Sequence, residues 1–278
     1  MDPADFAHVD LPHVGKRVFR MGVAGTYGIN SDDVRFAADK GVNYWVWGLG
    51  FGRVTEGIRD VLKADRERHV LAMLGGGVFG RQVRWSVENA LRDMKIDYLD
   101  VFLLGWLGVS SRYAPGIVDT LLKLKEEGKL RAIGTSIHDR ERAGALARDS
   151  AIDLFMLRYN AKHPGCEQDV FPHLAVRKPA VVAYTATAWR QLLRPLRGVE
   201  IGAAPASLGV APPLTPAHCY RFCLTNPNVH VVLTGPANRA ELEQNLACVQ
   251  QGPLAGDELA WVREYGLKVK SQRKLDYV

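Results

Sequence analysis

Residues 99–104 read LDVFLL, a nearly continuous apolar run in the middle of the chain. Such a run is typical of a strand that is buried on both faces of a parallel sheet. Residues 82–94 precede it with apolar side chains at helical spacing, and a second amphipathic stretch, 117–127, follows and stops at Gly128. This order of helix, strand and helix predicts repeated βα units.

The same alternation continues to both sides. Strands are expected at 17–23, 43–47, 70–73, 99–104, 130–134, 154–159, 180–184 and 230–233. Helices are expected at 31–40 (with Ser31 as N-cap), 54–63, 82–94, 117–127, 140–148, 168–176, 216–224, 240–250 and 256–265. Eight units without a break in composition predict a single α/β domain over residues 1–278, a (β/α)8 TIM barrel with an additional C-terminal helix and tail. The Gly-, Pro- and Ala-rich segment 193–213 is the expected mobile loop at the barrel mouth.

The composition narrows the function classes. The chain has 278 residues, 47% of them hydrophobic and 24% charged, with a net charge of +6. Its basic residues are spread along the chain, and the densest run, 268–274, has no nucleic-acid-binding motif beside it. We therefore expect no nucleic-acid partner. The charge equally suits an anionic small molecule such as a phosphorylated cofactor.

Cysteine usage and hydropathy predict a cytoplasmic protein. The cysteines are Cys166, Cys219, Cys223 and Cys248, and only Cys219 and Cys223 have a spacing that suits a metal. No second pair accompanies them, so no metal site is expected. The first residues do not form a signal peptide, and no apolar run approaches the ~18 residues of a membrane span.

Short motifs follow one another along the expected strands. They are GVNYW at 41–45, DYLDVFLLGW at 97–106, EGKLRAIGTS at 127–136, YN at 159–160, AYT at 183–185, and LTGPA at 233–237 with EQNL at 243–246. In this order they resemble the landmarks GINFFD, DYLDLYLLHW, EGKIRAIGVS, YN, AYS, IPGA and EENL of the aldo-keto reductases. Each motif is weak alone, but the ordered set covers roughly residues 17–250.

The resemblance implies a degenerate active site. The family uses a tyrosine as general acid, supported by an aspartate, a lysine and a histidine, because hydride addition to a carbonyl leaves an alkoxide that needs a proton. At the corresponding positions this chain has Val46, Phe51, Leu74 and Gly105. None of them can donate a proton or carry a charge, so the family's ordinary carbonyl reductase mechanism is not expected here.

The resemblance also implies that NADP(H) is a possible cofactor. Two family contacts to the nicotinamide amide have changed, to Ile137 and Met156. The N-terminus of the last barrel helix is a natural anion site. The retained positions are Ser136 and Tyr184 at the nicotinamide, and Gly235, Arg239, Gln244 and Asn245 at the phosphate end.

Other polar residues near the expected strand ends leave alternatives open. The catalytic candidates are Tyr27, His138, His163 and Glu167, and Glu167 could instead pair with Arg158. The barrel is therefore an atypical NADP-dependent oxidoreductase, a lyase or isomerase that uses His138, His163 and Glu167, or a non-catalytic binding scaffold. In each case a small-molecule ligand is expected at the barrel mouth. The aromatic residues Trp45, Trp47, Phe51, Trp106 and Trp189 would make that mouth apolar and suit a planar ligand, although packing in the core and at the rim explains most of them.

Overall fold

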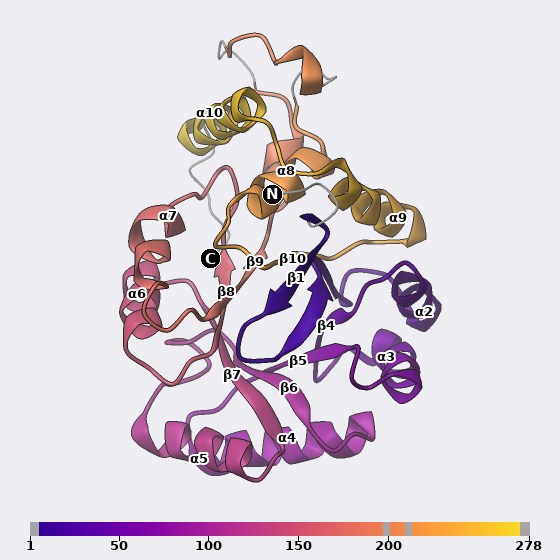
Figure 1. Ribbon diagram of the computed structural model, residues 1–278, viewed down its shortest axis with the longest axis vertical. Coiled ribbons are helices and arrows are strands. Elements are labelled where there is room, and N and C mark those ends of the chain that lie inside the picture. The colour runs from indigo at the N-terminus through magenta and orange to yellow at the C-terminus, as the bar shows by residue number, and fades with distance from the viewer. Residues whose placement is uncertain (1–5, 197–200, 209–212, 273–278) are drawn as a thin grey trace.

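The computed structural model describes residues 6–196, 201–208 and 213–272. Eight parallel strands form its centre: β3 (Met21–Ala24), β4 (Tyr44–Gly48), β5 (Val70–Gly75), β6 (Leu99–Leu104), β7 (Leu130–Ile137), β8 (Leu154–Arg158), β9 (Ala180–Tyr184) and β10 (Val231–Thr234). They close in the order β10-β3-β4-β5-β6-β7-β8-β9 (Figure 1). The predicted TIM barrel is confirmed.

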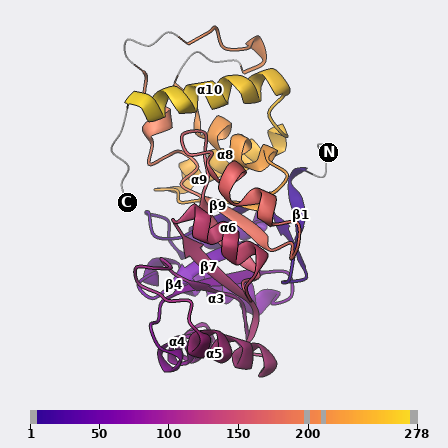
Figure 2. The same cartoon turned by 90° about the vertical axis from the view of Figure 1, so that its left-hand side faces the viewer.

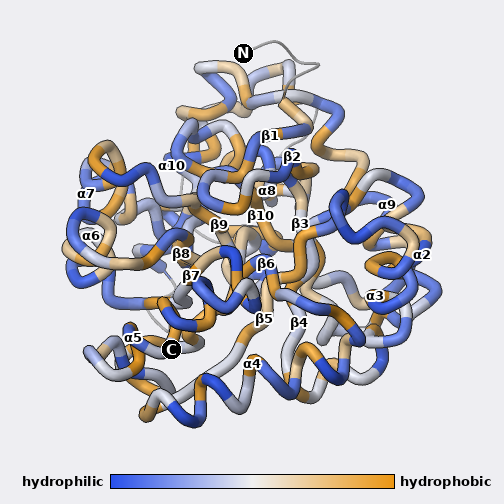
Figure 3. The backbone as a smooth tube through the Cα atoms, turned by 60° about the horizontal axis from the view of Figure 1, so that its bottom comes forward, coloured by the Kyte–Doolittle hydropathy of each residue, from blue (hydrophilic) through white to orange (hydrophobic). Residues whose placement is uncertain are grey.

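Helices surround the strands (Figure 1). They are α2 (Ser31–Asp39), α3 (Gly52–Ala64), α4 (Gly80–Met94), α5 (Pro115–Glu126), α6 (Arg140–Arg148), α7 (Cys166–Asp169), α8 (Pro216–Thr225), α9 (Arg239–Cys248) and α10 (Gly256–Gln272), with 3-10 turns at Phe171–His173, Gln191–Leu193, Ala206–Leu208 and Val249–Gln251. In Figure 3, α4 alternates between hydrophilic and hydrophobic residues along its length, as expected of a helix with one face against the sheet. None of the helices within the described ranges could cross a membrane.

The hydrophobic core has two parts because strand side chains alternate between the two faces of the sheet. In β6, Val101 and Leu103 belong to the cluster inside the barrel. Phe102 and Leu104, from the same strand, belong to the larger cluster between the strands and the helices. This explains why residues 99–104 are apolar almost throughout: both faces of the strand are buried.

The N-terminal end of the barrel is closed by a hairpin that the sequence pattern did not predict. Its strands are β1 (His8–Leu11) and β2 (Lys16–Phe19), paired antiparallel. Leu11 and Val18 pack into the cluster inside the barrel. The single strand expected at 17–23 is therefore wrong. It is divided at Arg20, whose guanidinium donates to the carbonyls of Leu224 and Val229 at 2.8 and 2.7 Å.

Two helix predictions also need correction. Helix α2 is capped by Asn30 rather than Ser31, since the Asn30 side chain accepts hydrogen bonds from the backbone amides of Asp32 and Asp33. The helix expected at 168–176 is the short α7 followed by a 3-10 turn. Pro172 lies in that turn, and because proline has no amide hydrogen it cannot continue an α-helical ladder.

Helix α10 lies across one end of the molecule next to α8 (Figure 2). It continues beyond the expected end at residue 265 to Gln272. The Trp261 indole donates to the carbonyl of Gly202 at 2.8 Å, and the Tyr265 hydroxyl donates to that of Arg194 at 3.0 Å. The helix thus holds described parts of the expected mobile segment 193–213. Residues 197–200 and 209–212 of that segment, and the tail 273–278, lie outside the described residues.

Candidate functional site

Three of the four positions where the resemblance predicts catalytic groups lie on neighbouring strands. Val46 is in the middle of β4, Leu74 is the last residue but one of β5, and Gly105 directly follows β6. Val46 is buried inside the barrel, and Leu74 packs against the same cluster. A Cβ atom added to Gly105 would lie 3.1 Å from Leu74 Cδ1 and 2.9 Å from the carbonyl oxygen of Gly75. The Leu74 side chain therefore fills the space beside Gly105.

Phe51 completes this side of the mouth. It is the residue before α3, and its ring lies close to Gly48, since a Cβ atom added there would be 3.6 Å from Phe51 Cε1. Gly48 is the register partner of Leu74 in the β4–β5 pair. Phe51, Leu74, Val46 and Gly105 together form what we name the hydrocarbon wall. It contains no titratable side chain, so it cannot donate a proton.

The opposite side of the mouth carries polar groups from β7, β8 and β9. The Tyr184 hydroxyl lies 3.1 Å from His138 Nε2, and the two rings are nearly perpendicular with centroids 5.9 Å apart. Burial, helped by the charge of Arg158, lowers the pKa of His138. Burial raises the pKa of Tyr184 to about 12. At neutral pH this is therefore a neutral phenol beside a neutral imidazole.

Ser136 belongs to the same side. It is buried on β7, and its hydroxyl is within hydrogen-bonding reach of Tyr184. Met156 is its register partner on β8. Of the six predicted cofactor residues, Ser136 and Tyr184 are thus brought together, and His138 joins them.

The predicted phosphate end lies at the loop between β10 and α9. The Tyr27 ring covers Gly235, since a Cβ atom added there would lie 2.3 Å from Tyr27 Cδ2. Gly28 lies equally close to the carbonyl of Ala237, with a φ of +150°. Only glycine fits at Gly28, whereas a side chain at Gly235 would displace the Tyr27 ring. Tyr27, which is 52% exposed, therefore belongs to this loop contact and not to the hydrocarbon wall.

Arg239, Asn245 and Gln244 are placed differently from one another. The Arg239 guanidinium donates to Asp33 Oδ1 at 2.5 Å and lies 4.4 Å above the Phe36 ring. Asn245 is buried and donates to the Thr234 hydroxyl at 2.9 Å. Gln244 is exposed. Arg239 and Gln244 can therefore reach a ligand, whereas the described contacts of Asn245 support the barrel itself.

The start of α9 already has a carboxylate of its own. Asn238 caps the helix by accepting from the amide of Glu241 at 2.9 Å. The Glu241 carboxylate accepts from the amide of Ala237 at 3.0 Å. An anion that binds at this helix terminus would lie beside that carboxylate, which raises the free-energy cost of binding.

Glu167 lies in a separate polar cluster. Arg263 of α10 makes two hydrogen bonds with its carboxylate, both 2.8 Å, and the buried Tyr159 hydroxyl donates to it at 2.5 Å. The alternative interpretation, in which Glu167 pairs with Arg158, is therefore wrong. These bonds occupy both oxygens of Glu167, and no hydrogen bond joins it to His138 or His163 among the described contacts. The described residues also contain no group of three or more His, Cys, Asp or Glu that could hold a metal ion.

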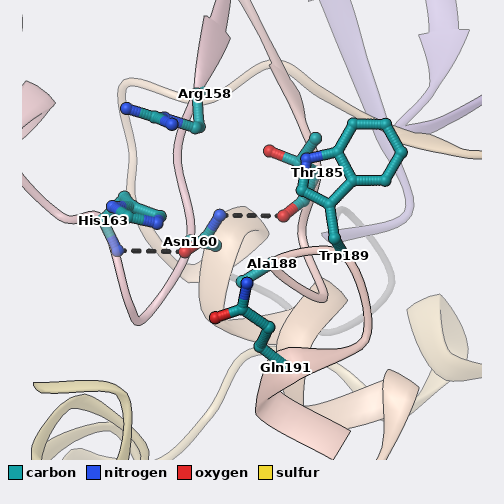
Figure 4. Close-up of a pocket in the computed structure, with 7 residues that line it drawn as sticks. All are labelled: Arg158, Asn160, His163, Thr185, Ala188, Trp189 and Gln191. Atoms are coloured by element: carbon teal, nitrogen blue, oxygen red, sulfur yellow. Dashed lines mark hydrogen bonds between the residues drawn. The ribbon is translucent and has the colours of Figure 1, made fainter. Parts of the chain in front are cut away.

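A small pocket opens between the ends of β8 and β9 (Figure 4). It contains about 210 Å³ of empty space, including its open mouth. Arg158 and His163 lie on one side of Asn160 in Figure 4, and Thr185 and Trp189 lie on the other. Its lining residues are Arg158, Asn160, His163, Thr185, Ala188, Trp189 and Gln191.

The aromatic residues do not all reach the mouth. Trp106 and Trp189 are about half exposed. Trp45 and Trp47 instead belong to the core between strands and helices, where their indoles donate to His69 Nδ1 and the Thr55 hydroxyl. Trp45 and Trp47 are the second and fourth residues of β4, which face outward, so they pack in the core and do not line the mouth. Gln191, which lines the pocket, could not be predicted from the sequence because no motif marks it.

Comparison with known proteins identifies the family. The Aldo/keto reductase family matches residues 34–194, more than half of the chain, and the chain belongs to that family. It resembles the holo form of an aldo-keto reductase from Bacillus halodurans, with a TM-score of 0.76, 21% identity, and coverage of 93% of this chain and 95% of that one. An aldo/keto reductase from Klebsiella pneumoniae in complex with NADP and acetate gives 0.73, 23% identity, and 94% and 95% coverage.

A curated relative matches a shorter stretch. The NADH-specific methylglyoxal reductase of Escherichia coli is 28% identical over 92 residues, which are 32% of this chain and 28% of that enzyme. The chain thus matches less than a third of that relative's length. At these identities, the solved structures establish the shared fold, and activity has to be argued from the site.

Proposed function

We propose that this barrel binds NADP(H) at its mouth and does not catalyse carbonyl reduction by the family's usual mechanism. The hydrocarbon wall is the observation that supports the second part. If the positions align as the motifs indicate, Val46, Phe51, Leu74 and Gly105 replace the aspartate, tyrosine, lysine and histidine of the family. A lost general acid typically lowers a rate by about 10² to 10⁴.

The replacements are mutually consistent. A buried lysine without its aspartate would leave one charge unpaired, whereas two hydrocarbon side chains pack together at no such cost. A histidine does not fit at position 105 without a shift of the backbone, because its Cβ atom would lie 2.9 Å from the carbonyl oxygen of Gly75. The local backbone is thus adapted to the residues that are present.

Cofactor binding is supported by the other side of the mouth. Ser136 and Tyr184 lie together at the position expected for a nicotinamide. Arg239 is the first residue of α9, and its side chain is 41% exposed. It is therefore the cation that a phosphate group at this helix terminus would meet. A solved family member of the same fold is described in complex with NADPH.

The four cysteines are all free thiols, which fits a reducing cytoplasm.

Nucleotide titration tests this proposal. NADPH is added to the purified protein while tryptophan emission and energy transfer to the nicotinamide are followed. We expect a micromolar Kd, weakened about tenfold in Arg239→Gln and unchanged in the control Arg140→Gln, whose side chain pairs with Asp169 on another helix. An absence of binding at millimolar NADPH would overturn the oxidoreductase-family function and leave the binding-scaffold and non-redox alternatives.

The Tyr184–His138 contact favours one second candidate, an atypical reductase. Its proton donor would be the Tyr184 hydroxyl, the phenol nearest to a neutral imidazole at this mouth. NADPH oxidation with methylglyoxal distinguishes the two. Under the main proposal, we expect NADPH oxidation with the wild-type protein to be no faster than without protein. A measurable rate that Tyr184→Phe abolishes, with NADPH affinity retained, would establish the atypical mechanism instead.

A further inference from the structure

Arg158 is a half-buried cation whose side chain has no hydrogen-bonding or ion-pair partner within the described residues. It ends β8 and is the register partner of Tyr184 on β9. Met156, two residues earlier, faces the inside of the barrel, so Arg158 faces the mouth on the same side of the strand. A guanidinium removed in part from water without an anion carries an unfavourable desolvation free energy, which a bound anion would offset.

The other polar groups of the pocket are used to hold its shape. Asn160 donates to the Thr185 carbonyl at 2.8 Å and accepts from the His163 amide at 3.0 Å. Beneath them the fully buried Lys162 donates to Gln191 at 2.8 Å. These bonds connect the loops after β8 and β9. Arg158 is thus left as the charged group available for recognition.

The wall opposite Arg158 is built on unusual backbone. Ala188, Trp189 and Arg190 have φ values of 50°, 55° and 64°, so three successive non-glycine residues adopt the left-handed conformation. This conformation costs roughly 1–2 kcal/mol for each such residue. Strained backbone of this kind clusters at ligand sites, where it fixes a side chain in place. Here it presents the Trp189 indole, 48% exposed, at the edge of the pocket.

We propose that this pocket binds a small organic acid, with its carboxylate on the Arg158 guanidinium and its flat apolar body against Trp189. The planar guanidinium fork matches a carboxylate with two parallel hydrogen bonds. An aromatic face adds apolar contact for a planar body. This ligand class deepens the proposed function by naming what shares the mouth with the nucleotide, and it rests on that function only for its location.

A nucleotide phosphate is the other source of anionic oxygens, and the position of Arg158 argues against it. Arg158 lies beside Tyr184, at the end of the mouth where the nicotinamide is expected. The start of α9 and Arg239, where phosphate is expected, follow β10, one strand beyond β9 in the barrel. A single guanidinium also matches the single charge of a carboxylate better than a diphosphate.

The test uses benzoate and its uncharged analogue benzamide, titrated into the full chain without nucleotide. Binding is followed by tryptophan emission and by ligand-observed NMR saturation transfer. We expect benzoate to bind and benzamide to bind at least tenfold more weakly. Arg158→Gln should lower benzoate affinity at least tenfold, and Arg158→Lys should restore part of it. The control Arg190→Gln, an exposed neighbour paired with Glu241, should leave it unchanged.

Several outcomes would overturn the inference. Equal binding of benzoate and benzamide would show that the pocket does not select charge. Unchanged benzoate affinity in Arg158→Gln, in protein with a wild-type melting temperature, would place the acid elsewhere. Inorganic pyrophosphate that competes with benzoate, together with loss of NADPH binding in Arg158→Gln, would assign Arg158 to the nucleotide. If the protein binds NADPH but not benzoate, only this inference is overturned. If it binds benzoate but not NADPH, only the proposed function is overturned.

Discussion

Arg239 and Asp33 form an ion pair between two neighbouring βα units, with Arg239 Nε 2.5 Å from Asp33 Oδ1. The pair joins the start of α9 to the first turn of α2, and the Phe36 ring supports the guanidinium from below. A 2′-phosphate at this end of the barrel would have to compete with Asp33 for the same guanidinium.

Asp33→Asn should therefore strengthen NADPH binding about three- to tenfold, because Arg239 loses a competing anion. NADH has no 2′-phosphate, so its affinity should not change. The control is Asp32→Asn, which alters an exposed carboxylate on the same turn that pairs with Arg35. Equal gains for NADH and NADPH, or none for NADPH, would show that Arg239 does not bind the 2′-phosphate. Fluorescence titration with both nucleotides measures the difference.

Leu74→Lys should destabilise the protein by about 1–3 kcal/mol, since it places an ammonium group at a half-buried position against the hydrocarbon wall without a carboxylate at Val46. The double variant Val46→Asp/Leu74→Lys should recover part of the loss if the two positions are close enough to pair. Leu122→Lys, at a 39% exposed position on α5, serves as the control. Urea denaturation measures the free energy of unfolding. A Leu74→Lys protein as stable as wild type would contradict the packing described.

Glu167→Gln should lower stability by roughly 2–3 kcal/mol and leave ligand binding unchanged, because the carboxylate holds Arg263 and the buried Tyr159 hydroxyl. Thermal unfolding and the NADPH titration test the two halves separately. Glu243→Gln, at an exposed position on α9, should change neither. If Glu167→Gln instead retained full stability but abolished an activity, the catalytic assignment of Glu167 would be restored.

Acid should destabilise the protein through two histidines, the buried His69 and the half-buried His230. Burial lowers the pKa of His69 and of His230 to about 4. Their Nδ1 atoms accept hydrogen bonds from the Trp45 indole and the Val181 amide, which requires the unprotonated form. In the unfolded chain both titrate near 6.5, so protons bind the unfolded state first. Stability is therefore complete above about pH 6.5 and falls as the pH drops towards 4.

Each histidine contributes up to about 1.4 kcal/mol per pH unit within that window. Unfolding free energies measured between pH 7 and pH 4 give the slope. His69→Asn keeps an acceptor for Trp45 but does not titrate, so its slope should be shallower by one histidine. An unchanged slope in His69→Asn would show that His69 is protonated in the folded protein.

The sequence by itself determined the barrel. Apolar runs such as 99–104, each followed by an amphipathic helix, specify buried parallel strands with helices outside, because period and burial are local properties of the chain. Ordered motifs also indicated the family, and the structural and family comparisons agree. Local pattern failed at 17–23, where a strand is divided at Arg20 by carbonyl groups more than two hundred residues away. It failed again at 168–176, where Pro172 shortens the helix.

Only the tertiary structure decided what the polar residues do. Glu167 could have paired with Arg158 by proximity in sequence, but Arg263 of α10 takes it instead. This choice left Arg158 at the mouth with no partner in the part of the chain that the structure describes, which is the basis of its proposed carboxylate site. Likewise Tyr27 and Gly235, at opposite ends of the chain, come into contact only because β10 pairs with β3 to close the barrel. Partner choice among charged and aromatic side chains depends on the closed geometry, and that information is not local.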